Sequence, residues 1–143
     1  MLDSVLRPVS GVLEWVFRRS TRGVIVHVYQ ARRAGSEEDP ALHVEVKVEN
    51  PQGENAFVSD FVVEMLEPFS ASASRYEYRS DSNTRISQLA LNVLSRGIAG
   101  PVIVIAFFSE HLPLSSGCRA RIAAIGRGHF RRRWQEFVCG PLA

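Results

Sequence analysis

The sequence has few of the residues that mark specialised classes of small protein. Its two cysteines, Cys118 and Cys139, are too few for a disulfide framework and lack the spacing of metal ligands. No apolar run is long enough to cross a bilayer as a helix. A secretory signal is also missing, because the N-terminus has no basic start and Arg7, Pro8 and Glu14 interrupt its apolar residues. These absences favour a soluble, cytoplasmic, single-domain protein.

Motifs for common catalytic chemistry are missing as well. The chain has no Gly-x-Ser-x-Gly elbow, no phosphate-binding loop and no dinucleotide fingerprint. A nucleophile needs a base and an orienting acid close in space, but the four histidines lie on separate predicted elements. Glu110 and His111 form one acid–histidine pair, and adjacent residues at a strand end point apart. We therefore predict a protein that is not an enzyme, with no catalytic residue, no metal site and no cofactor.

Lysine is nearly absent, and the arginines are unevenly distributed. Lys47 is the one lysine among 17 basic residues. Residues 1–33 carry six arginines against two acidic residues, and residues 96–143 carry seven arginines against two. Residues 34–95 carry four basic residues against eleven acidic ones. The chain is thus basic at both ends and acidic in the middle, which suits solvated strand faces or pairing between these segments.

The most apolar stretch of the chain is residues 101–108. Seven consecutive apolar residues follow Pro101, and four of them are β-branched. β-Branched and aromatic residues fit a pleated surface, and a strand without a polar face belongs in the middle of a sheet. We expect a central strand here, with both of its faces covered.

Alternating patterns predict further strands. Polar and apolar residues alternate over residues 24–33, 42–49 and 57–65, and turn residues separate these segments. A charged segment over 75–79 suits a sheet edge. Several short strands with short turns are typical of an antiparallel β-sandwich, and this layout is similar to immunoglobulin-like or fibronectin-like domains in strand count and spacing only. In the third segment the predicted core residues are Phe57, Phe61, Val63 and Met65.

Residues 84–96 fit two structures. Ile86, Leu89 and Val93 belong to a helical stripe, which Asn83 or Thr84 could cap and Gly97 could end. A strand is the alternative, but it leaves part of the stripe unexplained. We therefore expect one short helix here.

A second amphipathic stripe occupies the beginning of the chain. Apolar residues recur at the three- and four-residue spacing of a helix over residues 2–17. Pro8 either kinks this helix or lies in its first turn. The predicted organisation is an N-terminal amphipathic helix over residues 1–20 and a single β-sandwich domain over residues 21–143.

The end of this helix is a candidate docking surface. Trp15 and Phe17 stand beside Arg18 and Arg19, and this mixture suits a membrane surface or a protein partner. The alternative is that the helix packs on the domain and completes its core.

A basic hairpin is the strongest local signal in the sequence. Two alternating segments, 118–124 and 130–134, flank the turn residues Gly126 and Gly128. The guanidinium groups of arginines on such a hairpin can bind phosphates or carboxylates, although they can also pair with the acidic middle of the chain. The candidate binding residues are Arg119, Arg121, Arg127, Arg131 and Arg133.

The same hairpin carries both cysteines. If residues 126 and 129 pair across a two-residue turn, Cys139 lies diagonal to Cys118, two positions along the strand. Because a disulfide is rare in a cytoplasmic protein, we interpret both cysteines as packing residues.

The function that agrees best with these patterns is a non-enzymatic interaction or scaffolding module. It would dock a protein partner or self-associate, as a homo-oligomer, through its N-terminal helix and sheet surface. The alternative is binding of nucleic acid or of an anionic membrane surface through the arginine-rich hairpin.

Overall fold

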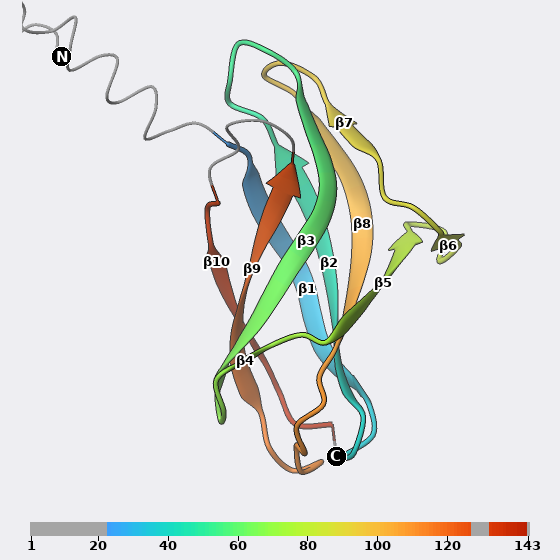
Figure 1. The fold of residues 1–143 in the computed structure, drawn as a ribbon, viewed down its shortest axis with the longest axis vertical. Helices are drawn as coiled ribbons and strands as arrows, with labels where there is room; N and C mark the ends of the chain where they lie inside the picture. Colours follow the sequence, from blue (N-terminus) through green and yellow to red (C-terminus); the bar gives the residue numbers. More distant parts are fainter. Residues whose placement is uncertain (1–22, 127–131, 143) are drawn as a thin grey trace, which may run out of the picture.

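Two antiparallel sheets pack face to face with an apolar core between them (Figure 1). The structure is a computed structural model that describes residues 23–126 and 132–142. The first sheet has the order β1-β2-β8-β5-β6; the second has the order β10-β9-β3-β4, with β7 also paired to β3. The strands are β1 (Ile25–Gly35), β2 (Pro40–Glu49), β3 (Ala56–Glu67), β4 (Ala71–Ser72), β5 (Arg75–Ser80), β6 (Arg85–Ile86), β7 (Leu91–Val93), β8 (Ile98–Phe107), β9 (Cys118–Gly126) and β10 (Gln135–Cys139).

The predicted β-sandwich and its central strand are confirmed. β8 lies between β2 and β5, and its inward residues Val104 and Ala106 are fully buried. β2 sends four apolar residues into the same core, as its alternation predicts. The prediction that both faces of this strand are covered holds only in part, because on the outer face Ile105 is buried but Ile103 and Phe107 are partly exposed. The Arg75 guanidinium lies 3.7 Å from the centre of the Phe107 ring.

A bulge changes which residues of β3 reach the core. Phe61, Val63 and Met65 are buried as predicted. The pairing of β3 with β9 is irregular between Val58 and Asp60, so the alternation changes phase there. Val58 is therefore fully buried, whereas Phe57, which was predicted in the core, is only partly buried.

The helix predicted over residues 84–96 is wrong. This segment contains the two short strands β6 and β7 and crosses from one sheet to the other between them. Asn83 and Arg96 have positive φ values of 66° and 60°, so the predicted helix ends are turns instead. Leu89 is buried because the crossing segment packs on the sandwich, and Val93 is buried as part of β7, so their helical spacing is incidental.

A second bulge turns an arginine inward. The pairing of β1 with β2 shifts between Val28 and Gln30, which leaves Tyr29 unpaired. Before this point even-numbered residues such as Val26 face the core; after it odd-numbered residues do. As a result Arg33 lies opposite Leu42 and is only 2% exposed.

The register of β9 and β10 is shifted by two residues from the register that a two-residue turn would give. Gln135 lies opposite Ile122, and Cys139 lies directly opposite Cys118 rather than diagonal to it.

Within the described residues, no helix is long and apolar enough to cross a membrane. The helix predicted over residues 1–20 lies outside the described residues.

Candidate functional site

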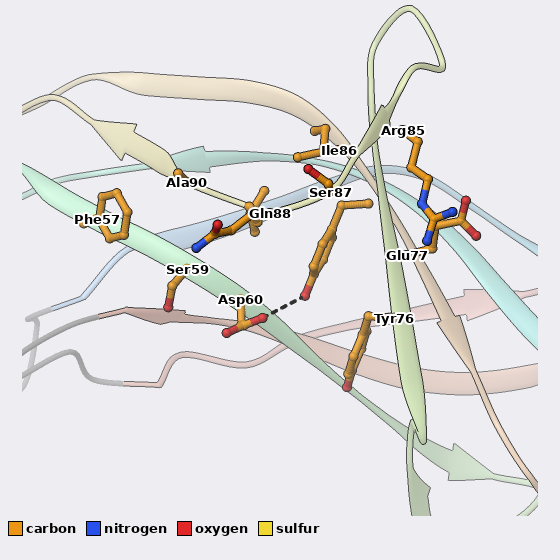
Figure 2. Close-up of a pocket in the computed structure, with 12 residues that line it drawn as sticks. Phe57, Ser59, Asp60, Tyr76, Glu77, Arg85, Ile86, Ser87, Gln88 and Ala90 are labelled. Atoms are coloured by element: carbon orange, nitrogen blue, oxygen red, sulfur yellow. Dashed lines mark hydrogen bonds between the residues drawn. The ribbon is translucent and has the colours of Figure 1, made fainter.

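A pocket of about 340 Å³ lies at the side of the sandwich where the segment between β6 and β7 crosses from one sheet to the other (Figure 2). Figure 2 shows Gln88 of the crossing segment above Ser59 and Asp60 of β3, with Tyr76 of β5 beside them. No sequence pattern predicted this pocket, because three separate segments of the chain form its walls. The lining residues are Phe57, Ser59, Asp60, Tyr76, Glu77, Tyr78, Arg85, Ile86, Ser87, Gln88, Leu89 and Ala90.

Two tyrosine hydroxyls connect the sheets beside this pocket. The backbone N–H of Phe61 donates to the hydroxyl of Tyr78 at 3.1 Å, and the N–H of Val63 donates to that of Tyr76 at 2.9 Å. Burial raises the pKa of Tyr78 to about 12 and also raises the pKa of Tyr76. Both phenols are therefore neutral at physiological pH, and they satisfy backbone donors of β3 between its pairings with β7 and β4.

The remaining polar groups of the pocket offer hydrogen bonds but no catalytic constellation. Asp60 lies 3.5 Å from the Tyr78 hydroxyl, at the limit of a hydrogen bond. Glu77 is already engaged by Arg79 at 2.8 Å. The lining contains no histidine and no cysteine. Within residues 23–126 and 132–142, no group of three or more histidine, cysteine or acidic side chains could hold a metal ion.

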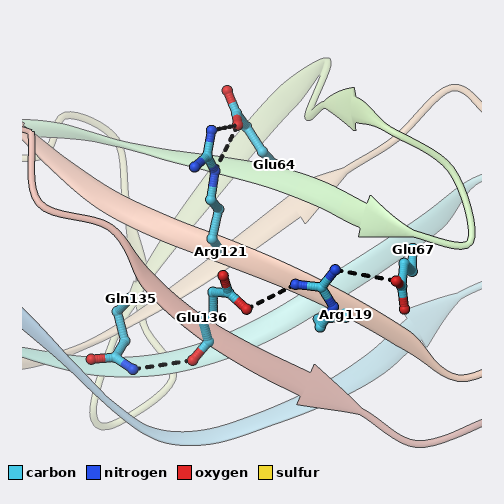
Figure 3. Close-up of polar contacts among 6 residues, drawn as sticks. All are labelled: Glu64, Glu67, Arg119, Arg121, Gln135 and Glu136. Atoms are coloured by element: carbon cyan, nitrogen blue, oxygen red, sulfur yellow. Dashed lines mark hydrogen bonds and ion pairs between the residues drawn. The ribbon is translucent and has the colours of Figure 1, made fainter.

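The arginines of β9 lie on the outer face of the second sheet, where acidic side chains engage them (Figure 3). Arg121 donates to one carboxylate oxygen of Glu64 through Nε at 2.9 Å and through Nη2 at 2.6 Å. Arg119 bridges Glu67 on β3 at 3.2 Å and Glu136 on β10 at 2.8 Å. These carboxylates raise the pKa of Arg119, with Glu67 the larger influence. We name these five side chains the charge ladder.

Trp134 extends this face, whereas the other predicted arginines do not join it in the described residues. The Arg121 guanidinium lies 3.9 Å from the centre of the Trp134 ring, and that of Arg132 lies 5.7 Å from it. Arg133 is partly buried and lies before β10 begins, in a segment that is not a strand. Other sequence-predicted site residues lie outside the described residues, namely Trp15, Phe17, Arg18, Arg19, Arg127 and Arg131.

Exposed apolar side chains gather at the turn between β7 and β8. Leu94 and Ile98 are 60% and 63% exposed and flank a turn closed by the Gly97 N–H, which donates to the Leu94 carbonyl at 2.8 Å. Ile98 lies opposite Glu49, which lies opposite Ile25 at the start of β1. We name Ile25, Leu94 and Ile98 the end patch; the Glu49 carboxylate, which pairs with His27 at 2.8 Å, lies between its two isoleucines. The chain enters β1 at this end of the sandwich (Figure 1).

Comparisons with known proteins assign no family. No protein-family model and no curated protein matches the chain. Among solved structures, the chain is similar to a β-glucuronidase from glycoside hydrolase family 2, with a TM-score of 0.42 and 14% sequence identity. The similarity covers 85% of this chain but 11% of that one. A similarity of this size transfers neither a family nor an activity to this chain.

Proposed function

We propose that the protein is a non-enzymatic interaction module whose partner is a second copy of the same chain. The observation that carries this proposal is the end patch. Its members are apolar, two of them are strongly exposed, and one of them, Ile25, is the first residue of β1. The sequence over residues 2–17 predicts a second apolar surface, the stripe of the N-terminal helix. A two-fold dimer would bury both surfaces at once.

The strand edges offer weaker support for self-association than the end patch does. Natural sheets prevent edge-to-edge pairing with bulges and with very short outer strands. The outer strand β1 contains the bulge at Tyr29, and β4 and β6 are two residues each. Tyrosine hydroxyls occupy backbone donors of β3. A dimer built on apolar side chains therefore agrees better with the structure than one built on a continuous sheet.

Light scattering across a dilution series of the full chain tests the proposal. We expect a dimer at micromolar concentration, and the pair Leu94→Asp with Ile98→Asp should shift it to monomer. Val138→Asp is the matched control, because Val138 is 70% exposed but lies on β10, outside the end patch. Its dimer should persist. A monomer for the unaltered chain at every concentration would overturn self-association and leave a different protein as the partner.

The alternative function is binding of nucleic acid or of an anionic membrane surface. Exposed Arg132 beside Trp134 favours it, because arginine and aromatic side chains together bind phosphates and stack on bases. The charge ladder argues against it, since Arg119 and Arg121 already have carboxylate partners. Fluorescence anisotropy with single-stranded and duplex DNA separates the alternatives. Tight binding that weakens steeply with salt would favour the alternative.

A further inference from the structure

Two buried thiols face each other across the last strand pair. Cys118 is the first residue of β9 and Cys139 is the last residue of β10, and the two are direct partners in the antiparallel register. They are 8% and 4% exposed and both are free thiols. Direct partners point to the same face of a sheet, so the two thiols lie side by side.

This arrangement meets the geometric demands of a disulfide. Direct partners in an antiparallel pair have Cα atoms about 4.5 to 5.5 Å apart. Disulfide-bonded cysteines have Cα atoms about 4.4 to 6.8 Å apart, so the bond needs no strand movement. The backbones are also close here, because a Cβ atom at Gly117 would lie 2.9 Å from the Cys139 carbonyl oxygen.

A cation stands near the thiol pair. The Arg33 guanidinium is buried and is engaged by the carbonyl oxygens of Leu112, Pro113 and Ser116. No carboxylate accepts from it among the described residues, and its Nε has no hydrogen-bond partner there. Together with the hydrogen bond from Cys139, its positive charge lowers the pKa of the Cys118 thiol, whereas the same pairing raises the pKa of Cys139. Cys118 is also the more exposed of the two thiols, so we assign it the attack on the oxidant.

From this geometry we propose that Cys118 and Cys139 are a reversible oxidation site, a dithiol that low-molecular-weight disulfides convert to a disulfide pinning β10 to β9. The Cys118 thiolate attacks one sulfur of the oxidant; a mixed disulfide forms and the first small thiolate leaves and takes up a proton. Cys139 then gives up its proton and attacks the Cys118 sulfur, which expels the second small thiolate. The protein loses two electrons and two protons, and one oxidant molecule becomes two thiols. This inference is independent of the proposed function.

Mass spectrometry of the full chain in a glutathione redox buffer tests the site. We expect the product to have lost two hydrogens without gaining glutathione, and dithiothreitol should restore the dithiol. The cross-link should also raise the melting temperature by several degrees, because it constrains the unfolded chain.

The matched control moves one cysteine by a single position. In the variant with Cys139→Ser and Val138→Cys, the second thiol lies on the exposed outer face of β10, so it should carry glutathione instead. The same oxidation is repeated while the protein refolds from urea, because the oxidant can then reach thiols that are buried in the folded protein. If the unaltered chain carries glutathione as the control does, or remains a dithiol in both arms, the proposal is overturned.

Discussion

The two sides of the sandwich satisfy buried polar groups with opposite chemistry. Near the end of β1, one buried arginine donates to three backbone carbonyl oxygens of the loop between β8 and β9. On the other side, the hydroxyls of Tyr76 and Tyr78 accept hydrogen bonds from backbone N–H groups of β3. A loop that turns carbonyls inward needs a donor, and a strand edge that turns N–H groups inward needs an acceptor.

This difference shows that the free-energy cost of burying a polar group depends on its chemistry. A guanidinium has five N–H donors in a fixed geometry, so it can bind several carbonyl oxygens at once. Its burial costs free energy, however, because a charge is removed from water. A phenol remains neutral when it is buried, and the phenols of Tyr76 and Tyr78 line the pocket. The arginine side should therefore be the more sensitive to substitution.

Removing the buried guanidinium should have the largest effect. Arg33→Met leaves the carbonyls of Leu112, Pro113 and Ser116 without their donor, and we expect the free energy of unfolding to fall by about 2 to 4 kcal/mol. Urea denaturation measures this loss. Arg32→Met is the control, because Arg32 is exposed on the same strand and should change stability little. Equal losses for the two variants would contradict the comparison.

Removing one tyrosine hydroxyl should cost less. Tyr78→Phe keeps the ring but leaves the buried N–H of Phe61 without an acceptor, so we expect a loss of about 1 to 2 kcal/mol in the free energy of unfolding. Tyr29→Phe is the matched control, since Tyr29 is an exposed tyrosine on β1. If both changes are neutral in urea denaturation, the hydroxyl is not needed to cap the strand.

The same tyrosine predicts a loss of stability in alkali. Burial raises the pKa of Tyr78 from 10.0 to about 12, so between these values the folded protein keeps a proton that the unfolded chain has released. The stabilising contribution is fully present below pH 10 and is lost as the pH rises toward 12. Urea denaturation at a series of alkaline pH values should show a shallower decline for Tyr78→Phe than for the unaltered chain. Parallel declines would place the alkaline transition elsewhere.

The charge ladder should contribute least to stability. Glu64→Gln frees Arg121 on a partly exposed face, and we expect less than about 1 kcal/mol of change in the free energy of unfolding. The same change, combined with Glu67→Gln and Glu136→Gln, should instead increase binding to duplex DNA at low salt, because it removes every carboxylate of the charge ladder from Arg119 and Arg121. Glu54→Gln, which removes a similar charge from an exposed turn, is the control. Unchanged anisotropy would show that the ladder does not suppress binding of anions.

Local pattern was a reliable guide where one face of a strand is buried along its whole length. The alternation of β2 and the apolar run of β8 correctly predicted two strands, because burial there follows the two-residue period of a strand; that they are neighbours in one sheet came from the structure. The pattern over residues 84–96 misled, because its apolar residues meet the core from a segment that crosses between sheets. Spacing along the chain then carries no information about the backbone.

The positions of the bulges and the register of the strand pairs depend on the tertiary structure. A single extra residue at Tyr29 reverses the faces of β1 and buries Arg33, and no local pattern marks that insertion. The pairing of Arg119 and Arg121 with acidic side chains of β3 depends on contacts between strands more than fifty residues apart in sequence. By itself the sequence determined the class of fold and the distribution of charge, since both follow from composition and from short-range periodicity. Which charges meet, and which cysteines face each other, depends on sheet register, and long-range packing sets that register.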